Sequence, residues 1–449
     1  MLAETKLLSL SKSKFLFNNI ILLRNISIST ANNAKDNYKL VVVGGGGAGL
    51  NISSRFVRKL GKTNVAIIEP SEWHLYQPGW TLAAGGVKNP DSFRRPQSKL
   101  IPSGVDWIKA KASVFEPESN SITLDNGEKV KYDYLVMATG IRIDFDGVKG
   151  LKEAMANDEQ VVSMYSHETV KNVFPAIQRY KGGNAIFTFP KVPIKCPGAP
   201  QKVMYLAEDY FRKNGVRDKG DVYYCTTIPA IFGVKKYAEA LMEVVKKREI
   251  KLNTLTHLIE IDYKNKQAVF EKLDKPGTTF RLDYSLLHVC PPMKPFDEIK
   301  NSPLVDETGY VDLDKYTLQH KKYPNVFGIG DCTNLPTSKT AAAIAAESSI
   351  LATNLGNLIK GKNPSEAKYD GYTSCPLITG YGKTILAEFD YDGKPLETFP
   401  INQGKERRTM FHLKSDFMPI LYWTAFVRGY WGGPGIYRKI LNIFSFGKN

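Results

Sequence analysis

The sequence contains no hydrophobic run long enough to cross a membrane. Its longest uncharged aromatic run, FMPILYWTAFV at residues 417–427, falls short of the ~20 apolar residues that a transmembrane helix needs. The five cysteines, an odd number scattered over 449 residues, do not form a structural disulfide framework. Hydrophobic residues nevertheless make up 43% of the chain, which excludes a disordered or collagen-like protein, and the length predicts two or three domains.

Acidic residues are scarce relative to basic ones, and the imbalance is concentrated at the two ends of the chain. The formal net charge is +16, of which residues 1–35 carry +4 and residues 405–449 carry +6. The central body is therefore only modestly basic. A basic groove across the fold is not supported, and we expect no nucleic acid among the partners.

The first 35 residues are basic, rich in serine and nearly free of acid, with Leu, Ile and Phe spaced to give a helix one apolar face. This composition is typical of a mitochondrial transit peptide, which we predict for residues 1–35. A secretory signal fits less well, because Asn18 and Asn19 interrupt its short apolar run and no A-x-A-like cleavage site follows. A merely disordered N-terminus is the other alternative.

A glycine-rich motif, G-x-G-x-x-G at residues 44–49, follows a predicted buried strand at residues 40–43 and precedes a predicted helix at residues 51–60. Such glycines permit a tight turn, close approach of the backbone to a pyrophosphate and close helix–strand packing. A second apolar strand at residues 64–68 ends in Glu69, where an acid can bind ribose hydroxyls. We therefore predict a dinucleotide-binding domain.

This domain is predicted to resume after a long insertion. A strand at residues 134–137 runs into a tight turn at residues 138–140, and residues 326–330 form a strand that leads to Asp331, before a helix expected from Thr340. Such a discontinuity is typical of flavoprotein reductases, whereas a single nicotinamide domain ends within roughly 150 residues. Asp331 is expected to cap the following helix, to face the flavin ribityl chain, or both.

The insertion has its own alternation of elements and is predicted to be a second doubly wound domain. Strands are expected at residues 184–189 and 221–226, and helices at residues 201–213 and 234–247. The predicted fold class is therefore α/β, with two Rossmann-like domains of the flavoprotein disulfide-reductase type and a C-terminal amphipathic membrane-binding region. The predicted division is residues 37–150 and 298–384 for FAD binding, 151–297 for the second domain and 385–449 for the C-terminal quinone and membrane region.

The second domain lacks the motif that NAD(P)H would require. The turn after its first strand should carry another G-x-G-x-x-G, but residues 190–200 are instead rich in proline and contain Cys196. Cys375 lies in another Cys-Pro element, 179 residues further along the chain. We expect both loops to approach the flavin and the two thiols to have a redox role.

The other three cysteines are expected to be small buried hydrophobes. They are Cys225, Cys290 and Cys332.

The C-terminal region combines aromatic and basic residues. The aromatic candidates for contact with a quinone or a membrane are Phe411, Phe417, Tyr422 and Trp423. In a helix over residues 436–446, one face carries Ile436, Ile440, Ile443 and Phe444, and the other Arg438, Asn442 and Ser445. An interfacial helix on anionic headgroups has this pattern, as does a helix packed on the protein's own core. Because an NAD(P) site is missing, we favour a monotopic membrane anchor beside a quinone tunnel.

Several motifs resemble the mitochondrial sulfide:quinone oxidoreductases of the eukaryotic type. Besides the glycine-rich turn, they are EPSEWHLYQP at residues 69–78, KCPG at 195–198, PTSKTA at 336–341 and YTSCP at 372–376. The likeness runs from about residue 39 to residue 439, and the two Cys-Pro motifs are its most specific part.

The resemblance implies that Cys196 and Cys375 are the catalytic pair and that FAD is the cofactor. The implied FAD contacts are Gly44, Gly46, Ala48, Gly49, Glu69, Gln77, Ala112, Asp331, Lys339, Thr340 and Ala341. No cysteine precedes Cys196 in the chain, so we expect FAD to be bound noncovalently. Lys195 and Lys339 either favour the thiolate and anionic acceptors or are solvated surface lysines. No metal is expected.

The activity implied by the resemblance is oxidation of hydrogen sulfide at a Cys196–Cys375 disulfide, with Cys375 as the persulfide carrier and Cys196 as the flavin-facing thiol. Two electrons pass through FAD to ubiquinone, and the sulfane sulfur passes to a small nucleophile such as sulfite or glutathione. The implied location is the mitochondrial inner membrane. The alternatives are a membrane-associated NADH:quinone oxidoreductase and a noncatalytic flavin redox sensor.

Overall fold

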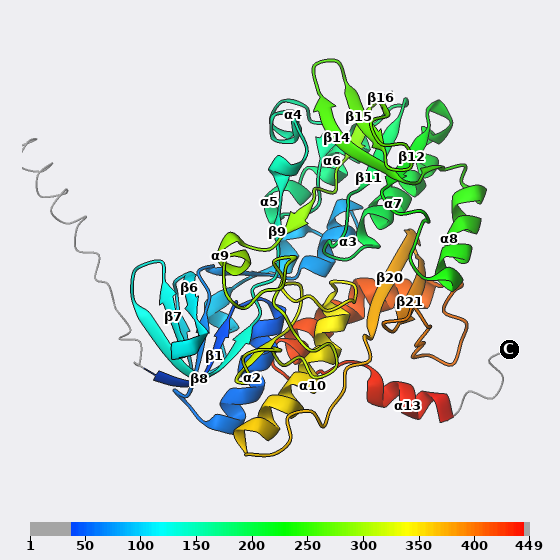
Figure 1. Cartoon of the computed structure of the whole chain (residues 1–449). Coiled ribbons are helices and arrows are strands. Elements are labelled where there is room, and N and C mark those ends of the chain that lie inside the picture. The colour runs from blue at the N-terminus through cyan, green and yellow to red at the C-terminus, as the bar shows by residue number, and fades with distance from the viewer. Residues whose placement is uncertain (1–36, 444–449) are drawn as a thin grey trace, which may run out of the picture. The chain divides into compact units, whose positions relative to one another are not determined.

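The computed structural model describes residues 37–443 (Figure 1). The predicted transit peptide and positions 444–446 of the predicted C-terminal helix lie outside the described residues. The first sheet has seven strands: β1 (Asn37–Val43), β2 (Val65–Ile68), β5 (Val105–Ile108), β6 (Ala112–Glu116), β7 (Ser121–Leu124), β8 (Lys129–Met137) and β19 (Val326–Gly328). Strand β1 lies between β2 and β8, and β19 adds to β8, all in parallel. Strand β19 is far from the others in sequence, so the predicted resumption of this sheet after the insertion is confirmed.

The central strands of this sheet are hydrophobic on both faces. Strand β2 is buried along its whole length, as a parallel sheet covered on both sides requires. Helices α2 (Gly47–Leu60) and α10 (Ala341–Ile359) pack against each other (Figure 1). Helix α2 begins four residues earlier than predicted, because Gly46 is its N-cap and the last glycine of the motif already lies in its first turn.

The insertion forms a five-stranded parallel sheet in the order β10 (Val161–Val162), β17 (Leu286–His288), β11 (Ala185–Phe189), β12 (Val222–Thr226) and β13 (Lys251–Asn253). Its helices are α4 (Leu151–Asn157), α5 (His167–Val170), α6 (Val173–Arg179), α7 (Ala199–Lys213) and α8 (Lys235–Lys247). A three-stranded antiparallel sheet follows, β14 (Thr256–Asp262), β15 (Gln267–Lys272) and β16 (Thr279–Asp283).

The strands and helices predicted for the insertion are confirmed as elements. Helix α7 begins two residues before the predicted start, because Pro200 occupies the first turn of a helix, where proline costs no hydrogen bond. The exact division of the chain into domains stays a prediction.

Short elements complete this part of the fold. They are β3 (Trp73–Leu75) paired with β4 (Arg94–Pro96), α3 (Trp80–Ala84), β9 (Arg142–Ile143) paired with β18 (Met293–Lys294), and α9 (Asp297–Lys300).

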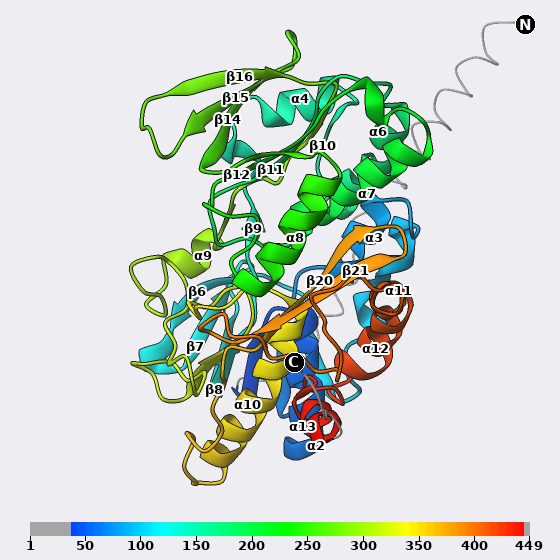
Figure 2. The ribbon, with the colours of Figure 1, turned by 90° about the vertical axis from the view of Figure 1, so that its right-hand side faces the viewer.

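A buried hairpin follows α10 in the chain. Strands β20 (Thr373–Gly380) and β21 (Lys383–Phe389) form it, and β20 packs against both α7 and α10 (Figure 2). Every residue of β20 is buried. The hairpin therefore lies between a helix of the insertion and a helix of the first sheet.

The last described part of the chain is helical. It comprises α11 (Arg408–His412), a π-helical segment Leu413–Phe417, α12 (Met418–Leu421), a second π-helical segment Tyr422–Phe426, and α13 (Gly435–Ile443). Among the described residues, no helix is both long and apolar enough to span a bilayer.

Helix α13 presents its isoleucines to solvent. Ile436, Ile440 and Ile443 are 73%, 50% and 70% exposed, whereas the guanidinium of Arg438 lies 4.4 Å from the ring centroid of Tyr372. The alternative that this apolar face packs on the protein's own core is therefore wrong for these three isoleucines.

Candidate active site

One cavity of about 900 Å³ joins the glycine-rich turn, the loop before α7, the segment between β19 and α10, and the C-terminal helices. This volume suits an organic ligand, for which pockets of ~300–1,000 Å³ are usual. Of the residues predicted to bind FAD, those lining the cavity are Gly44, Gly46, Ala48, Glu69, Gln77, Asp331, Lys339, Thr340 and Ala341.

Two predicted FAD contacts are not among the described residues that line the cavity. Gly49 packs α2 against the turn instead, since a Cβ there would lie 1.8 Å from the carbonyl oxygen of Gly44. Ala112 begins β6 and pairs with Leu124 of β7.

The glycine-rich turn has the features of a pyrophosphate site. Helix α2 has no acidic residue in its first turn, and a Cβ on its N-cap, Gly46, would meet nothing within 4 Å. The partial positive charge of the helix start therefore faces open space in the cavity. The carboxylate of Glu69 accepts a hydrogen bond from the backbone N–H of Gly45 at 2.6 Å, which holds the turn against the end of β2. These residues fit a dinucleotide.

Asp331 lies after β19 and lines the cavity. The N-cap of α10 is Thr340, whose hydroxyl accepts a hydrogen bond from the N–H of Ala343, so the expectation that Asp331 caps this helix is wrong. Burial raises the pKa of Asp331, although the charges of Lys195 and Lys339 act to lower it.

The two predicted redox cysteines lie side by side. Their Sγ atoms are 3.5 Å apart, although one precedes α7 and the other lies on β20. A Cβ on Gly198 would lie 2.5 Å from the sulfur of Cys375, so only glycine permits this approach. Cys196 adopts a φ of +54°, a strained conformation for a residue with a side chain, and its N–H donates to the carbonyl of Lys339 at 2.8 Å.

The other three cysteines are buried, as expected. Burial raises the pKa of Cys225 to about 12 and also raises the pKa values of Cys290 and Cys332. These thiols stay protonated at neutral pH and have the character of small hydrophobes.

The lysine that faces the thiols is one that the sequence reasoning missed. The Nζ of Lys202 donates to the Sγ of Cys196 at 3.3 Å, and this side chain is only 2% exposed. The hydrogen bond from Cys375, and then the charges of Lys202 and Lys414, lower the pKa of Cys196 well below its ordinary value. The hydrogen bond with Cys196, and then burial, raise the pKa of Cys375. The pair is therefore asymmetric, with the negative charge favoured on Cys196.

Lys414 is a second buried lysine near the sulfurs. Burial, and then the charge of Lys202, lower its pKa to about 7. Its Nζ donates to the carbonyl of Pro78 at 2.7 Å.

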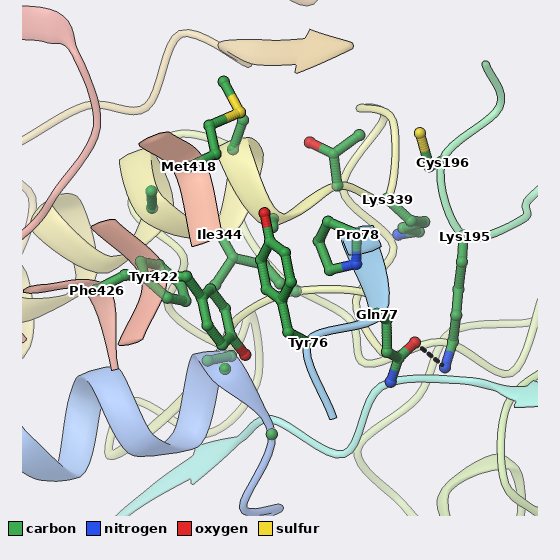
Figure 3. A pocket seen from close by; sticks show the side chains of 18 of the residues that line it. Tyr76, Gln77, Pro78, Lys195, Cys196, Lys339, Ile344, Met418, Tyr422 and Phe426 are labelled. Atoms are coloured by element: carbon green, nitrogen blue, oxygen red, sulfur yellow. Dashed lines mark hydrogen bonds between the residues drawn. The ribbon is translucent and has the colours of Figure 1, made fainter. Parts of the chain in front are cut away.

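The two lysines proposed from sequence have other partners. Lys195 donates to the side chain of Gln77 at 3.1 Å (Figure 3), and the buried Lys339 donates to the carbonyl of Thr333. Lys202 lies six residues after Cys196 in a predicted helix. This spacing could have predicted that its side chain points back toward the thiol. No comparable signal pointed to Lys414, which approaches from the C-terminal helices.

The four aromatic residues predicted for the quinone region divide into two groups. Phe417 and Tyr422 line the cavity, together with Leu421, Phe426 and other residues of the C-terminal helices. Phe411 and Trp423 are buried outside the cavity lining, and the ring centroid of Trp423 lies 4.1 Å from the guanidinium of Arg95.

The cavity extends to the exposed apolar side chains. Its lining includes Phe417 of the first π-helical segment and Tyr437 and Leu441 of α13. Phe417 and Tyr437 are more than half exposed, as is Ile420 in α12. An apolar rim therefore borders one end of the cavity, and Cys196 lines another part of it, whereas Cys375 is not among the described residues that line it.

Comparison with known proteins gives consistent results. Residues 38–172 match the model of the pyridine nucleotide-disulphide oxidoreductase family. The chain is 52% identical to the mitochondrial sulfide:quinone oxidoreductase of Mus musculus over 410 residues, which cover 91% of each chain. It is 45% identical to that of Dictyostelium discoideum, with 89% of this chain and 88% of the relative covered.

Among solved structures, the sulfide:quinone oxidoreductase from the bacterium Aquifex aeolicus superimposes with a TM-score of 0.73 at 19% identity. The match covers 92% of this chain and 96% of the other, and it shows a shared fold.

Proposed function

The chain belongs to the mitochondrial sulfide:quinone oxidoreductases, and from this premise we propose that Cys196 and Cys375 are the pair at which it oxidises hydrogen sulfide. The enzyme uses FAD and passes electrons to a quinone. The observation that carries the assignment of the pair is the 3.5 Å separation of the two sulfurs, together with the position of Cys196 in the wall of the cavity that contains the glycine-rich turn.

In the first step, hydrosulfide attacks the sulfur of Cys375 in the oxidised Cys196–Cys375 disulfide. The bond between the two cysteines breaks, a new S–S bond leaves Cys375 as a persulfide, and Cys196 departs as a thiolate. The disulfide gains the two electrons that the sulfide loses. Lys202, whose Nζ lies 3.3 Å from the Cys196 sulfur, stabilises the departing thiolate.

A nucleophilic acceptor then takes the sulfane sulfur from Cys375 and leaves the thiol pair reduced. When bound in the cavity, FAD supplies a two-electron acceptor for this pair and a two-electron donor for quinone. Lys202 and Lys414 add positive charge beside the sulfurs, which favours an anionic acceptor such as sulfite or the thiolate of glutathione.

FAD is held noncovalently by the residues at the cavity wall. The glycine-rich turn and the start of α2 hold the pyrophosphate, and Glu69 binds the ribose. Asp331, Lys339 and the start of α10 contact the ribityl chain and the ring end of FAD. Gln77 contributes to FAD binding by accepting a hydrogen bond from Lys195, which also lines the cavity.

Quinone enters where the apolar rim borders the cavity. The exposed isoleucines of α13 and the exposed Phe417 and Ile420 rest in one leaflet of the mitochondrial inner membrane, without crossing it. Lys439, which is exposed on α13, faces anionic headgroups. This monotopic arrangement gives an apolar electron acceptor a route that avoids water.

The two alternatives have less support. The loop that follows β11 carries Cys196 into the cavity wall in place of a glycine-rich nucleotide turn, which disfavours NADH as the donor. A noncatalytic sensor would not need an apolar rim leading into the cavity.

The test uses the purified FAD-loaded chain under anaerobic conditions. With sulfite present as the sulfur acceptor, sulfide should bleach the flavin and support reduction of decylubiquinone in wild type, and it should fail to do so in Cys196→Ser and Cys375→Ser. The matched control Cys225→Ala should keep both activities. Bleaching by NADH would favour the NADH:quinone alternative, and sulfide-dependent bleaching without quinone turnover would favour the sensor.

A further inference from the structure

His74 is a buried residue of the sequence motif at residues 69–78 to which the proposed function assigns no role. It lies on β3, is 3% exposed and bridges two distant parts of the chain. Its Nδ1 lies 3.1 Å from the carbonyl oxygen of Gly45 in the glycine-rich turn, and its Nε2 lies 2.7 Å from the hydroxyl of Tyr422.

The partners of the imidazole determine its tautomer. A carbonyl oxygen can only accept, so Nδ1 carries the proton and donates to Gly45. Nε2 of the neutral ring is then an acceptor, and the hydroxyl of Tyr422 donates to it. Burial lowers the pKa of His74 to about 4, and the Arg95 guanidinium opposite it on β4 acts in the same direction, so the ring is neutral at physiological pH.

Gln97 and Glu69 also form hydrogen bonds with Gly45. The side-chain amide of Gln97 donates to the carbonyl of Gly45 at 2.9 Å, while Glu69 accepts from its N–H. The conformation of Gly45 is thus coupled to His74 through a carbonyl that is already part of a fixed hydrogen-bond network.

Tyr422 is the point at which the C-terminal helices approach the turn. A Cβ on Gly47 would lie 2.9 Å from the Tyr422 hydroxyl. The Tyr422 ring packs 4.6 Å from the ring of Tyr76 and stacks at 5.2 Å on Phe426, and Figure 3 shows the rings of Tyr76 and Tyr422 side by side in the cavity.

The chain after Tyr422 is tied to α2 by further polar contacts. The side chain of Asn51 donates to the carbonyl of Phe426 at 2.7 Å, and the hydroxyl of Ser54 donates to the carbonyl of Val427 at 2.9 Å. The segment that forms the apolar end of the cavity therefore takes its position from the helix and turn that form the pyrophosphate end.

We infer that His74 is a positioning residue for the quinone half-reaction: by holding Tyr422 against the glycine-rich turn, it couples the shape of the quinone end of the cavity to the cofactor-binding turn. The inference rests on the proposed function for the identity of the quinone end. Sulfide oxidation takes place at the thiols, whose sulfur atoms contact each other and Lys202, so we expect that half-reaction to depend less on this link.

The experiment compares three variants of the FAD-loaded full chain. His74→Phe keeps a ring but removes both hydrogen bonds, and Tyr422→Phe removes the donor. His74→Gln supplies an amide that can donate to Gly45 and accept from Tyr422. In stopped-flow measurements, flavin reduction by sulfide should fall by a smaller factor than quinone reduction in His74→Phe and Tyr422→Phe.

The quinone side should respond differently. The KM for decylubiquinone should rise roughly tenfold in His74→Phe and in Tyr422→Phe, and the double variant should be no worse than either, because both remove the same bond. His74→Gln should restore most of the loss. Hydrogen exchange of the backbone amides at residues 413–431, measured on the resting holoenzyme, should be faster in His74→Phe than in wild type.

An unchanged quinone KM together with unchanged exchange in His74→Phe would overturn the inference. So would an equal loss of both half-reactions, which would indicate a purely structural role. If wild type itself gives no sulfide-dependent reduction, the proposed function fails instead, and the exchange measurement still decides whether His74 holds the segment.

Discussion

The Nζ of Lys202 lies 3.3 Å from the Sγ of Cys196, and both belong to one local unit of the chain. Helix α7 begins at Ala199, directly after the cysteine loop, so a lysine in its first turns projects back toward the sulfur. The same helix packs against β20, which carries Cys375. The element that brings the thiols together thus also supplies a positive charge at hydrogen-bond distance from Cys196.

Removal of the Lys202 charge should raise the pKa of the Cys196 thiol. In Lys202→Met, loss of an opposite charge at hydrogen-bond distance predicts an upward shift of about 1–3 units. The pH dependence of iodoacetamide alkylation of the reduced enzyme measures this. Lys191→Met, at an exposed position before the same loop, removes the same charge and should leave the alkylation profile unchanged. Equal profiles for wild type and Lys202→Met would exclude the proposed role of Lys202.

Lys414 should make the stability of the protein depend on pH. Its pKa is lowered to about 7 in the folded chain from an ordinary 10.5, so between these values the unfolded chain binds a proton that the folded chain does not. The destabilisation caused by this lysine is therefore greatest at and below pH 7 and falls as pH rises, by at most ~1.4 kcal/mol per pH unit.

The corresponding measurement is the thermal unfolding of oxidised wild type and Lys414→Met at several pH values. The Tm advantage of the variant should be larger at pH 7 than at pH 9. The exposed Lys383→Met should show no such trend. A difference between Lys414→Met and wild type that does not change with pH would contradict the assignment.

The exposed isoleucines of α13 should determine membrane binding. Replacement of Ile436, Ile440 and Ile443 by Ser removes apolar area worth ~1.5–3 kcal/mol for each fully buried side chain, so affinity for vesicles with anionic lipid should fall at least 100-fold. Sulfide-dependent flavin reduction should persist. Met242→Ser, at an exposed position on α8, is the matched control and should bind vesicles like wild type. Vesicle binding by the triple variant at wild-type strength would rule out α13 as the anchor.

Glu69 should contribute to retention of FAD. Its carboxylate accepts from the N–H groups of Gly45 and Ser71, so Glu69→Ala loosens the turn as well as removing the ribose partner. Affinity for FAD, measured by titration of the apoprotein, should fall roughly 10- to 100-fold. The exposed Glu72, which pairs with Lys109, gives the control Glu72→Ala. Equal FAD affinity in the two variants would argue against this role for Glu69.

Local sequence patterns predicted much of the fold. Apolar strands such as β1 and β2, the glycine-rich turn and the helices of the insertion all have signals within a few residues. Helix starts were less accurate, because Gly46 and Pro200 were interpreted as loop residues although one is an N-cap and the other lies in a first helical turn.

The contacts that the sequence could not predict join distant segments. The proximity of Cys196 and Cys375 was expected from the two Cys-Pro elements, whereas the approach of Lys414 to the thiols and of Tyr422 to His74 depends on how the C-terminal helices pack. Two π-helical segments determine which side chains of those helices face the cavity, and a 3.6-residue periodicity does not reveal them.

The most direct test of the redox pair is to find the sulfur after a single turnover. Oxidised enzyme is mixed with one equivalent of sulfide without an acceptor, alkylated at once and digested for mass spectrometry. The account predicts one extra sulfur atom on Cys375 and an alkylated thiol on Cys196. An extra sulfur on Cys225, Cys290 or Cys332, or on none of the five cysteines, would contradict it.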